Sequence, residues 1–179
     1  MRANDMIVNL YLRDRWRLQN QFGTRIAFPS DTERVLDFVR AEFPDEKGWL
    51  MEIEHALHEG KCAISVIDYK IVGFACYDCT GKGYFGPFGV AKSHRGKGIG
   101  TELLYECFDN MQCMGYGYAI IGWVGETAKG FYEKVANAWC IPNSEPNRTL
   151  YMRRINTIIE SGDDSAWNEY HAKIKSGYY

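Results

Sequence analysis

Three glycines stand close together at the point where an amphipathic helix must begin. The stretch is VAKSHRGKGIGTELL, residues 90–104, with glycine at 96, 98 and 100 and basic side chains at 92, 95 and 97. Glycine weakens helices, so its presence here needs a reason. Clustered N–H groups at the positive end of a helix dipole bind anions, and glycine lets phosphate oxygens approach the backbone. The stretch therefore predicts an anion site, to which Thr101 adds a hydroxyl.

This positive charge is a local feature of a nearly neutral chain. The protein has 179 residues, of which 46% are apolar and 15% aromatic, and its formal net charge is −2. Such a chain buries the core of one domain and has no general affinity for polyanions. We therefore expect a small anionic ligand and no nucleic acid.

Several other classes of protein are disfavoured. No run approaches the ~20 apolar residues of a membrane span, and residues 1–16 lack a secretory pattern. The six cysteines follow no disulfide framework, and the C-x-x-C of Cys76 and Cys79 has no second pair. We expect reduced thiols, no metal site, no membrane contact and a cytoplasmic location.

Hydrophobic periodicity predicts a mixed α/β domain without internal repeats. Ser30 and Glu33 have the spacing of a capping box, and Pro44 is expected to end the helix that follows them. Pro87 and its flanking glycines predict an irregular, partly unpaired strand at 83–90. The other expected strands are 6–12, 25–28, 61–68, 70–78, 118–124, 138–141 and 149–155. The expected helices are 30–43, 47–60, 98–114 and 127–135.

Two familiar phosphate loops do not fit the glycine stretch. A Walker A loop needs Ser or Thr after Gly-Lys, but Gly98 follows Lys97. A dinucleotide fingerprint starting at Gly98 needs a small residue at position 103, which is Leu103. The motif R-x-x-G-x-G at Arg95, Gly98 and Gly100 resembles instead the acyl-CoA pyrophosphate loop of the GNAT superfamily of N-acetyltransferases. The order strand, loop, long helix, strand and A-x-x-F-Y supports this resemblance over residues 25–154, and FGPFGV is similar to a bacterial subgroup.

The resemblance implies a central mixed, mostly antiparallel sheet with a splayed parallel strand pair and about four flanking helices. It also implies acetyl-CoA as the acyl donor, whose pantetheine binds the unpaired strand and whose pyrophosphate binds the glycine loop. The donor-binding residues it implies are Phe88, Gly89, Val90, Arg95, Gly96, Lys97, Gly98, Ile99, Gly100 and Thr101.

The resemblance further implies acetyl transfer to a primary amine, of a small molecule or of a protein, by direct attack in a ternary complex. The N–H near Val90 stabilises the oxyanion, and Tyr132 matches the tyrosine that commonly protonates the leaving thiolate. The general base stays open among Glu126, Asp78 and His94. The acceptor region is expected around residues 30–60 and the strand ends, where we consider Trp49, Glu52, Tyr77, Asp78, Tyr84 and Trp123.

Three positions depart from the family pattern: Lys92 replaces a frequent proline, His94 a common aromatic residue, and Gly125 an asparagine that orients acyl-CoA. These departures keep a second hypothesis open, a catalytically inactive acyl-CoA-binding or regulatory module. We divide the chain into an N-terminal extension with a possible extra strand (1–24), the acetyltransferase domain (25–155) and a C-terminal tail (156–179). A homodimer is compatible with the resemblance.

Overall fold

The computed structural model describes residues 4–12, 20–46 and 48–144. These residues form a seven-stranded sheet with the strand order β2-β3-β4-β5-β6-β1-β7. The strands are β1 (Asn4–Asn9), β2 (Arg25–Ile26), β3 (Cys62–Ile67), β4 (Lys70–Tyr77), β5 (Tyr84–Val90), β6 (Tyr118–Val124) and β7 (Trp139–Cys140). The helices are α1 (Thr32–Glu42), α2 (Trp49–His58), α3 (Ile99–Cys113) and α4 (Glu126–Ala136), with short 3-10 turns η2 (Pro29–Asp31) and η3 (Lys92–His94).

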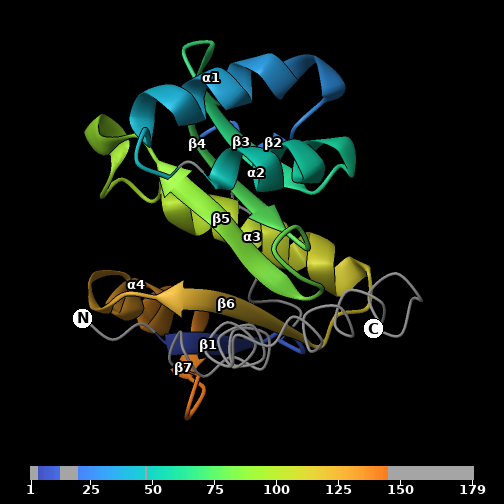
Figure 1. Cartoon of the computed structure of the whole chain (residues 1–179), viewed down its shortest axis with the longest axis vertical. Coiled ribbons are helices and arrows are strands. Elements are labelled where there is room, and N and C mark those ends of the chain that lie inside the picture. The colour runs from blue at the N-terminus through green and yellow to red at the C-terminus, as the bar shows by residue number, and fades with distance from the viewer. Residues whose placement is uncertain (1–3, 13–19, 47, 145–179) are drawn as a thin grey trace, which may run out of the picture.

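The sheet is antiparallel except for one parallel pair, β5 and β6. In Figure 1 helices α1 and α2 lie in front of the strands on one side of this pair, and α3 lies behind β5. The expectation of a mixed, mostly antiparallel sheet with four flanking helices is confirmed.

Apolar residues alternate along the strands and so supply a core to each face of the sheet. On the face of α1 and α2, Ile64 and Phe74 are fully buried against Val35, Val39 and Ile53. The core on the α3 face includes Met6, Leu103, Leu104, Phe108, Met111 and Ile121. Each helix is therefore held by burial of one apolar stripe.

Turn residues end these elements mostly where the sequence predicts. Asp68 and Tyr69 both have positive φ, as a two-residue hairpin between β3 and β4 requires. Helix α1 ends at Glu42, before Pro44, as expected. The capping box expected at Ser30 and Glu33 is wrong, because α1 begins at Thr32 and Asp31 takes over the polar contacts there.

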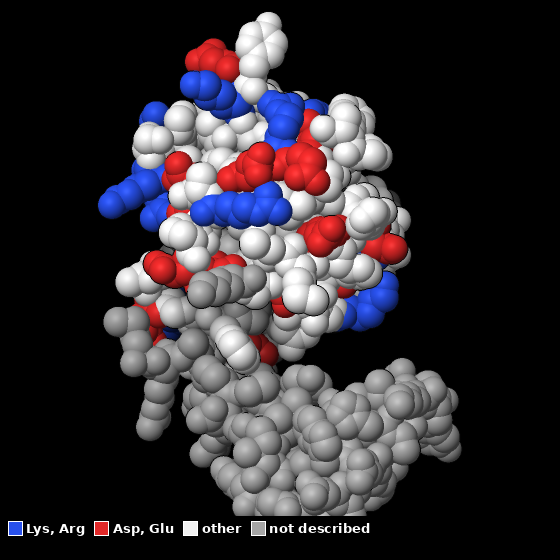
Figure 2. Space-filling model, turned by 45° about the horizontal axis from the view of Figure 1, so that its top comes forward, with Lys and Arg blue, Asp and Glu red and all other residues white. Residues whose placement is uncertain are grey.

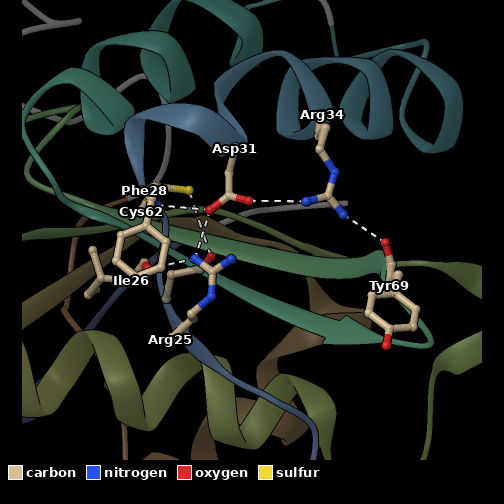
Figure 3. Close-up of polar contacts among 8 residues, drawn as sticks. Arg25, Ile26, Phe28, Asp31, Arg34, Cys62 and Tyr69 are labelled. Atoms are coloured by element: carbon tan, nitrogen blue, oxygen red, sulfur yellow. Dashed lines mark hydrogen bonds and ion pairs between the residues drawn. The ribbon is translucent and has the colours of Figure 1, made fainter.

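Asp31 joins four segments of the chain (Figure 3). Its carboxylate accepts the N–H of Phe28 at 2.9 Å and pairs with Arg25 at 2.7 Å and with Arg34 at 3.2 Å. Arg34 also donates to the carbonyl of Tyr69 at 2.7 Å. This carboxylate therefore ties β2 and η2 to α1, and through Arg34 to the β3–β4 turn.

Strand β1 lies inside the sheet, between β6 and β7, although it comes from the expected N-terminal extension. Its residues Met6 and Val8, and Leu10 after it, are fully buried. The domain boundaries at residues 24 and 155 stay predictions, and the expected strand at 149–155 and the tail lie outside the described residues. Among the described residues, no helix is long and apolar enough to cross a membrane.

Candidate functional site

Strands β5 and β6 run side by side for a short distance and then diverge (Figure 1). They pair at Tyr84–Ile120 and Phe85–Ile121, whereas β5 continues to Val90 and β6 to Val124. Pro87 has no N–H to donate, and the preceding Gly86 has φ +121°, so β5 cannot continue a regular ladder here. The divergence expected over residues 88–90 is present.

The other edge of β5 remains attached to the sheet. Strand β4 pairs with it antiparallel as far as Gly73–Val90, and the N–H of Ala91 donates to the carbonyl of Val72 at 2.9 Å. A Cβ atom on Gly89 would lie 2.5 Å from the ring of Phe43, so glycine is required for close packing. The divergent end of β5 is therefore held rigidly from one side.

The predicted phosphate loop forms an exposed turn before α3. Gly96 has φ +76° and Gly98 φ +96°, conformations that glycine adopts without steric cost. Gly98 directly precedes α3, so the loop lies at the positive end of a 15-residue helix. A Cβ atom on Gly96 would meet nothing within 4 Å, which leaves its backbone open to an approaching group.

Two other residues of the predicted loop, Gly100 and Thr101, also make contacts within the protein, and their contacts with the donor stay predictions. A Cβ on Gly100 would lie 3.0 Å from the ring of Phe88, so this glycine makes room for a side chain of the protein. The N–H of Thr101 donates to the carbonyl of Gly98 at 3.0 Å. Thr101 would therefore contact a ligand through its hydroxyl and not through its N–H. Arg95 donates from Nε to the carbonyl of Val90 at 3.0 Å and fixes the loop to the end of β5.

Tyr132 lies on α4 in an aromatic cluster beside the divergent strand. Its ring centroid is 6.3 Å from that of Phe85, 6.4 Å from Phe88 and 5.2 Å from Phe131. Phe88 in turn stacks on Phe131 at 5.9 Å. Tyr132 is 7% exposed, and this burial raises the pKa of its phenol well above the ordinary value, so the hydroxyl keeps its proton at neutral pH.

The three candidate bases lie in different surroundings, and Asp78 is held in a structural network. Its carboxylate accepts the N–H of Gly83 and the hydroxyl of Tyr116, each at 2.8 Å. Burial raises the pKa of Asp78, but these bonds, with Lys82 and Lys61 at 3.5 Å, outweigh burial and lower it. Glu126 opens α4 on the surface, and His94 Nδ1 contacts the hydroxyl of Ser93 in the exposed turn η3.

Glu52 on α2, which the sequence places only in the acceptor region, is a further partly buried carboxylate near β5. Burial raises its pKa, and the side chain of Thr80 hydrogen-bonds to it. The neighbouring thiol of Cys79 donates to the carbonyl of Gly86 at 3.1 Å, next to the break in β5. Helix α2 contains two acidic residues, Glu52 and Glu54, and only the fold shows that Glu52 is the partly buried one, whereas Glu54 is exposed. The described residues contain no group of three or more His, Cys, Asp or Glu able to hold a metal ion.

Charged side chains of both signs are mixed on one face of the molecule. On the face shown in Figure 2, basic and acidic side chains are interspersed over the described part of the molecule. The basic residues at 92, 95 and 97 are close together in the sequence, in and just before the loop.

Solved structures similar to this chain include several acetyltransferases. A GCN5-related N-acetyltransferase from Sphaerobacter thermophilus has 20% identity and a TM-score of 0.62, over 79% of this chain and 50% of that one. A GNAT family acetyltransferase from Colwellia psychrerythraea has 16% identity and a TM-score of 0.60, over 78% and 52%. The GCN5-related glucosamine N-acetyltransferase region of a fungal multi-domain enzyme has 16% identity and a TM-score of 0.59, over 78% and 20%. Identities this low show a shared fold, and this chain spans about half or less of each of these proteins.

The family itself is identified by a match of sequence. A comparison with curated proteins gave no match. A family model described as Acetyltransferase (GNAT) family matches residues 26–137, which include the divergent strands, the glycine loop and Tyr132. Since this match covers more than half of its residues, the chain belongs to the GNAT acetyltransferase family.

Proposed function

We propose that this protein transfers an acetyl group from acetyl-CoA to a primary amine by direct attack in a ternary complex. The observation that supports this most strongly is the combination of a divergent parallel strand pair with an open glycine loop at a helix N-terminus. One strand edge suits the extended, amide-bearing pantetheine, and the loop suits the pyrophosphate beside it. The second candidate, an acyl-CoA-binding module without turnover, predicts the same binding and no product.

The backbone of β5 suggests how the donor is held. Neighbouring residues of a strand point their N–H groups to opposite edges. Since the N–H of Ala91 is directed to β4, that of Val90 faces the diverging β6, and the carbonyl of Val90 is held on that edge by Arg95. We propose that the pantetheine binds along this edge and that the Val90 N–H stabilises the oxyanion. The amides of Gly96, Gly98 and their neighbours, with Lys97, then bind the pyrophosphate.

The proposed reaction forms a C–N bond and breaks the C–S bond of the thioester. A neutral amine attacks the carbonyl carbon, and its surplus proton passes to a base, for which we propose Glu52 because burial raises its affinity for protons. The hydroxyl of Tyr132 donates its proton to the leaving sulfur, and solvent returns a proton to Tyr132 while Glu52 releases the amine proton to solvent. The proton lost by the amine thus balances the proton gained by sulfur.

The first experiment is calorimetric titration of the purified protein with acetyl-CoA, CoA and 3′-dephospho-CoA. We expect saturable, micromolar binding of acetyl-CoA, and weaker binding of the dephospho analogue if a basic residue contacts the 3′-phosphate. Incubation with a panel of amines and detection of acetylated product by mass spectrometry then separates the two candidates. Binding without any product would favour the module without turnover, and no binding of all three ligands would refute both.

A charge introduced at Gly98 tests the loop directly. Gly98→Glu places a carboxylate beside the proposed pyrophosphate and should abolish acetyl-CoA binding, while Gly98→Gln has the same backbone strain without the charge and should bind more tightly than Gly98→Glu. Gly115→Glu is a matched control, because Gly115 ends the same helix with a similar φ of +92° and open space around it. Unchanged affinity in Gly98→Glu would refute the loop assignment.

A further inference from the structure

Trp123 has a backbone conformation that bulky residues rarely adopt. Its φ is +52°, in the left-handed region, and its side chain is 56% exposed. A bulky non-glycine residue adopts this region only where its surroundings favour the conformation. Trp123 is the second residue after Ile121, where the pairing of β6 with β5 ends. This conformation therefore lies at the point where the two strands diverge.

Asp5 on β1 contacts the backbone of Trp123 in this conformation. Its Oδ1 accepts the backbone N–H of Trp123 at 3.0 Å, and the hydroxyl of Tyr84 also hydrogen-bonds to its carboxylate. Asp5 is only 5% exposed, and its own N–H donates to the hydroxyl of Ser144 at 2.9 Å. Its carbonyl accepts the N–H of Ile141 at 2.8 Å. The backbone of Asp5 is thus hydrogen-bonded to residues that follow β7, separately from the contact of its carboxylate with Trp123.

The register of β1 and β6 identifies the result as a bulge. Met6 pairs with Ile121 and Asn4 with Val124, so that Gly122 and Trp123 together lie opposite the single residue Asp5. A bulge of this kind bends its strand and increases the local twist. The ring of Tyr84 packs closely against this bulge. A Cβ atom on Gly122 would lie only 3.2 Å from the ring.

We propose that Asp5 is a positioning residue of the acyl-donor site, which bends β6 away from β5 through the N–H of Trp123 and so keeps the edge of β5 open for pantetheine. The inference rests on the proposed function. It assigns a part of the site to β1, which lies outside the residues that the family model matches. Pro87 and Gly86 interrupt the pairing from the β5 side, and Asp5 does so from the β6 side.

The test compares variants by acetyl-CoA affinity and by kinetics. Asp5→Ala should weaken acetyl-CoA binding and raise its KM at least tenfold, whereas the KM of the amine should change less than threefold. Asp5→Asn, whose amide oxygen can still accept the Trp123 N–H, should remain within threefold of the wild type. Ser144→Ala removes the side-chain partner of the Asp5 N–H but leaves the bond from Ile141 to the Asp5 carbonyl, so it should lower Tm without changing acetyl-CoA affinity. Wild-type affinity in Asp5→Ala, or an equal loss in Ser144→Ala, would overturn the proposal.

A rescue experiment separates positioning from general stability. Glycine adopts a positive φ without support, so Trp123→Gly removes the need for Asp5. The double variant Asp5→Ala/Trp123→Gly should bind acetyl-CoA within threefold of Trp123→Gly alone, and this pair decides the question even if Asp5→Ala does not fold. A tenfold difference would show that Asp5 does not act through the Trp123 backbone. Failure of the wild type to bind acetyl-CoA would refute the proposed function instead.

Discussion

Tyr132 places a phenolic hydroxyl within a cluster of aromatic rings. The role of this hydroxyl can therefore be tested by removing its oxygen atom alone. Tyr132→Phe keeps the ring that packs against Phe85, Phe88 and Phe131 and removes only the hydroxyl. If the hydroxyl assists the leaving thiolate, kcat should fall about 100-fold, the scale of one acid–base group. The Kd of acetyl-CoA, measured by calorimetry, should change less than threefold. An unchanged kcat would leave Tyr132 with a purely structural role.

The sequence predicts those residues of the site whose signal is local. The positive φ of Gly96 and Gly98 follows from a run of glycines before an apolar helix. Gly100 shows the limit of such reasoning, because the ring that occupies its space belongs to Phe88, twelve positions earlier. Asp5 has no local signal at all, since its partner Trp123 is 118 positions away and only the sheet brings the two together.

At the scale of elements, the first turn of α3 also holds the segment before β2. The carboxylate of Glu102 accepts the N–H groups of Gln21 at 2.6 Å and Phe22 at 3.2 Å, and the hydroxyl of Thr24 at 2.9 Å. This places the ring of Phe22 beside Gly98, 3.4 Å from where a Cβ would lie. The segment before β2 therefore packs against the glycine loop.

Loss of the Glu102 charge should loosen this attachment. In Glu102→Gln one acceptor oxygen becomes an amide donor that faces other donors, which should lower the free energy of unfolding by about 1 to 3 kcal/mol. Urea denaturation measures the change. Glu106→Gln, one turn further along α3, is the control, because the glutamine oxygen can still accept the amide of Asn110. Equal effects of the two substitutions would contradict the role assigned to Glu102.

The ends of elements are predicted well where turn residues or proline mark them in the sequence. Ends that depend on contacts with residues of other elements are not. The hairpin at Asp68 and Tyr69 and the interruption of β5 at Pro87 follow from residues within each segment. The start of α1 was predicted wrongly because Ser30 has the better capping pattern. Asp31 defines that start because Arg25 and Arg34, on two different elements, converge on its carboxylate.

At the scale of the whole molecule, Asp31 makes the free energy of unfolding depend on pH. The hydrogen bond from Arg25 lowers the pKa of this carboxyl; burial opposes the effect, and the bond from Phe28 and the charge of Arg34 add to it. A carboxyl with a lowered pKa stabilises the folded state above its unfolded pKa, near ~4, and this stabilisation is lost as the pH falls through the lower folded value. Its contribution should therefore be complete at neutral pH.

Asp31→Asn should accordingly destabilise the protein most at pH 7. We expect a loss of about 1 to 2 kcal/mol there, because the two arginines are partly exposed and their pairing is screened by solvent. Urea unfolding at a series of pH values should show the difference between wild type and variant shrinking below pH ~4. Asp37→Asn is the matched control: it removes a carboxylate from α1, the helix that follows Asp31, and this carboxylate pairs with Arg40 at 2.7 Å but is 74% exposed. A pH-independent difference for Asp31→Asn would mean that its charge does not hold the four segments together.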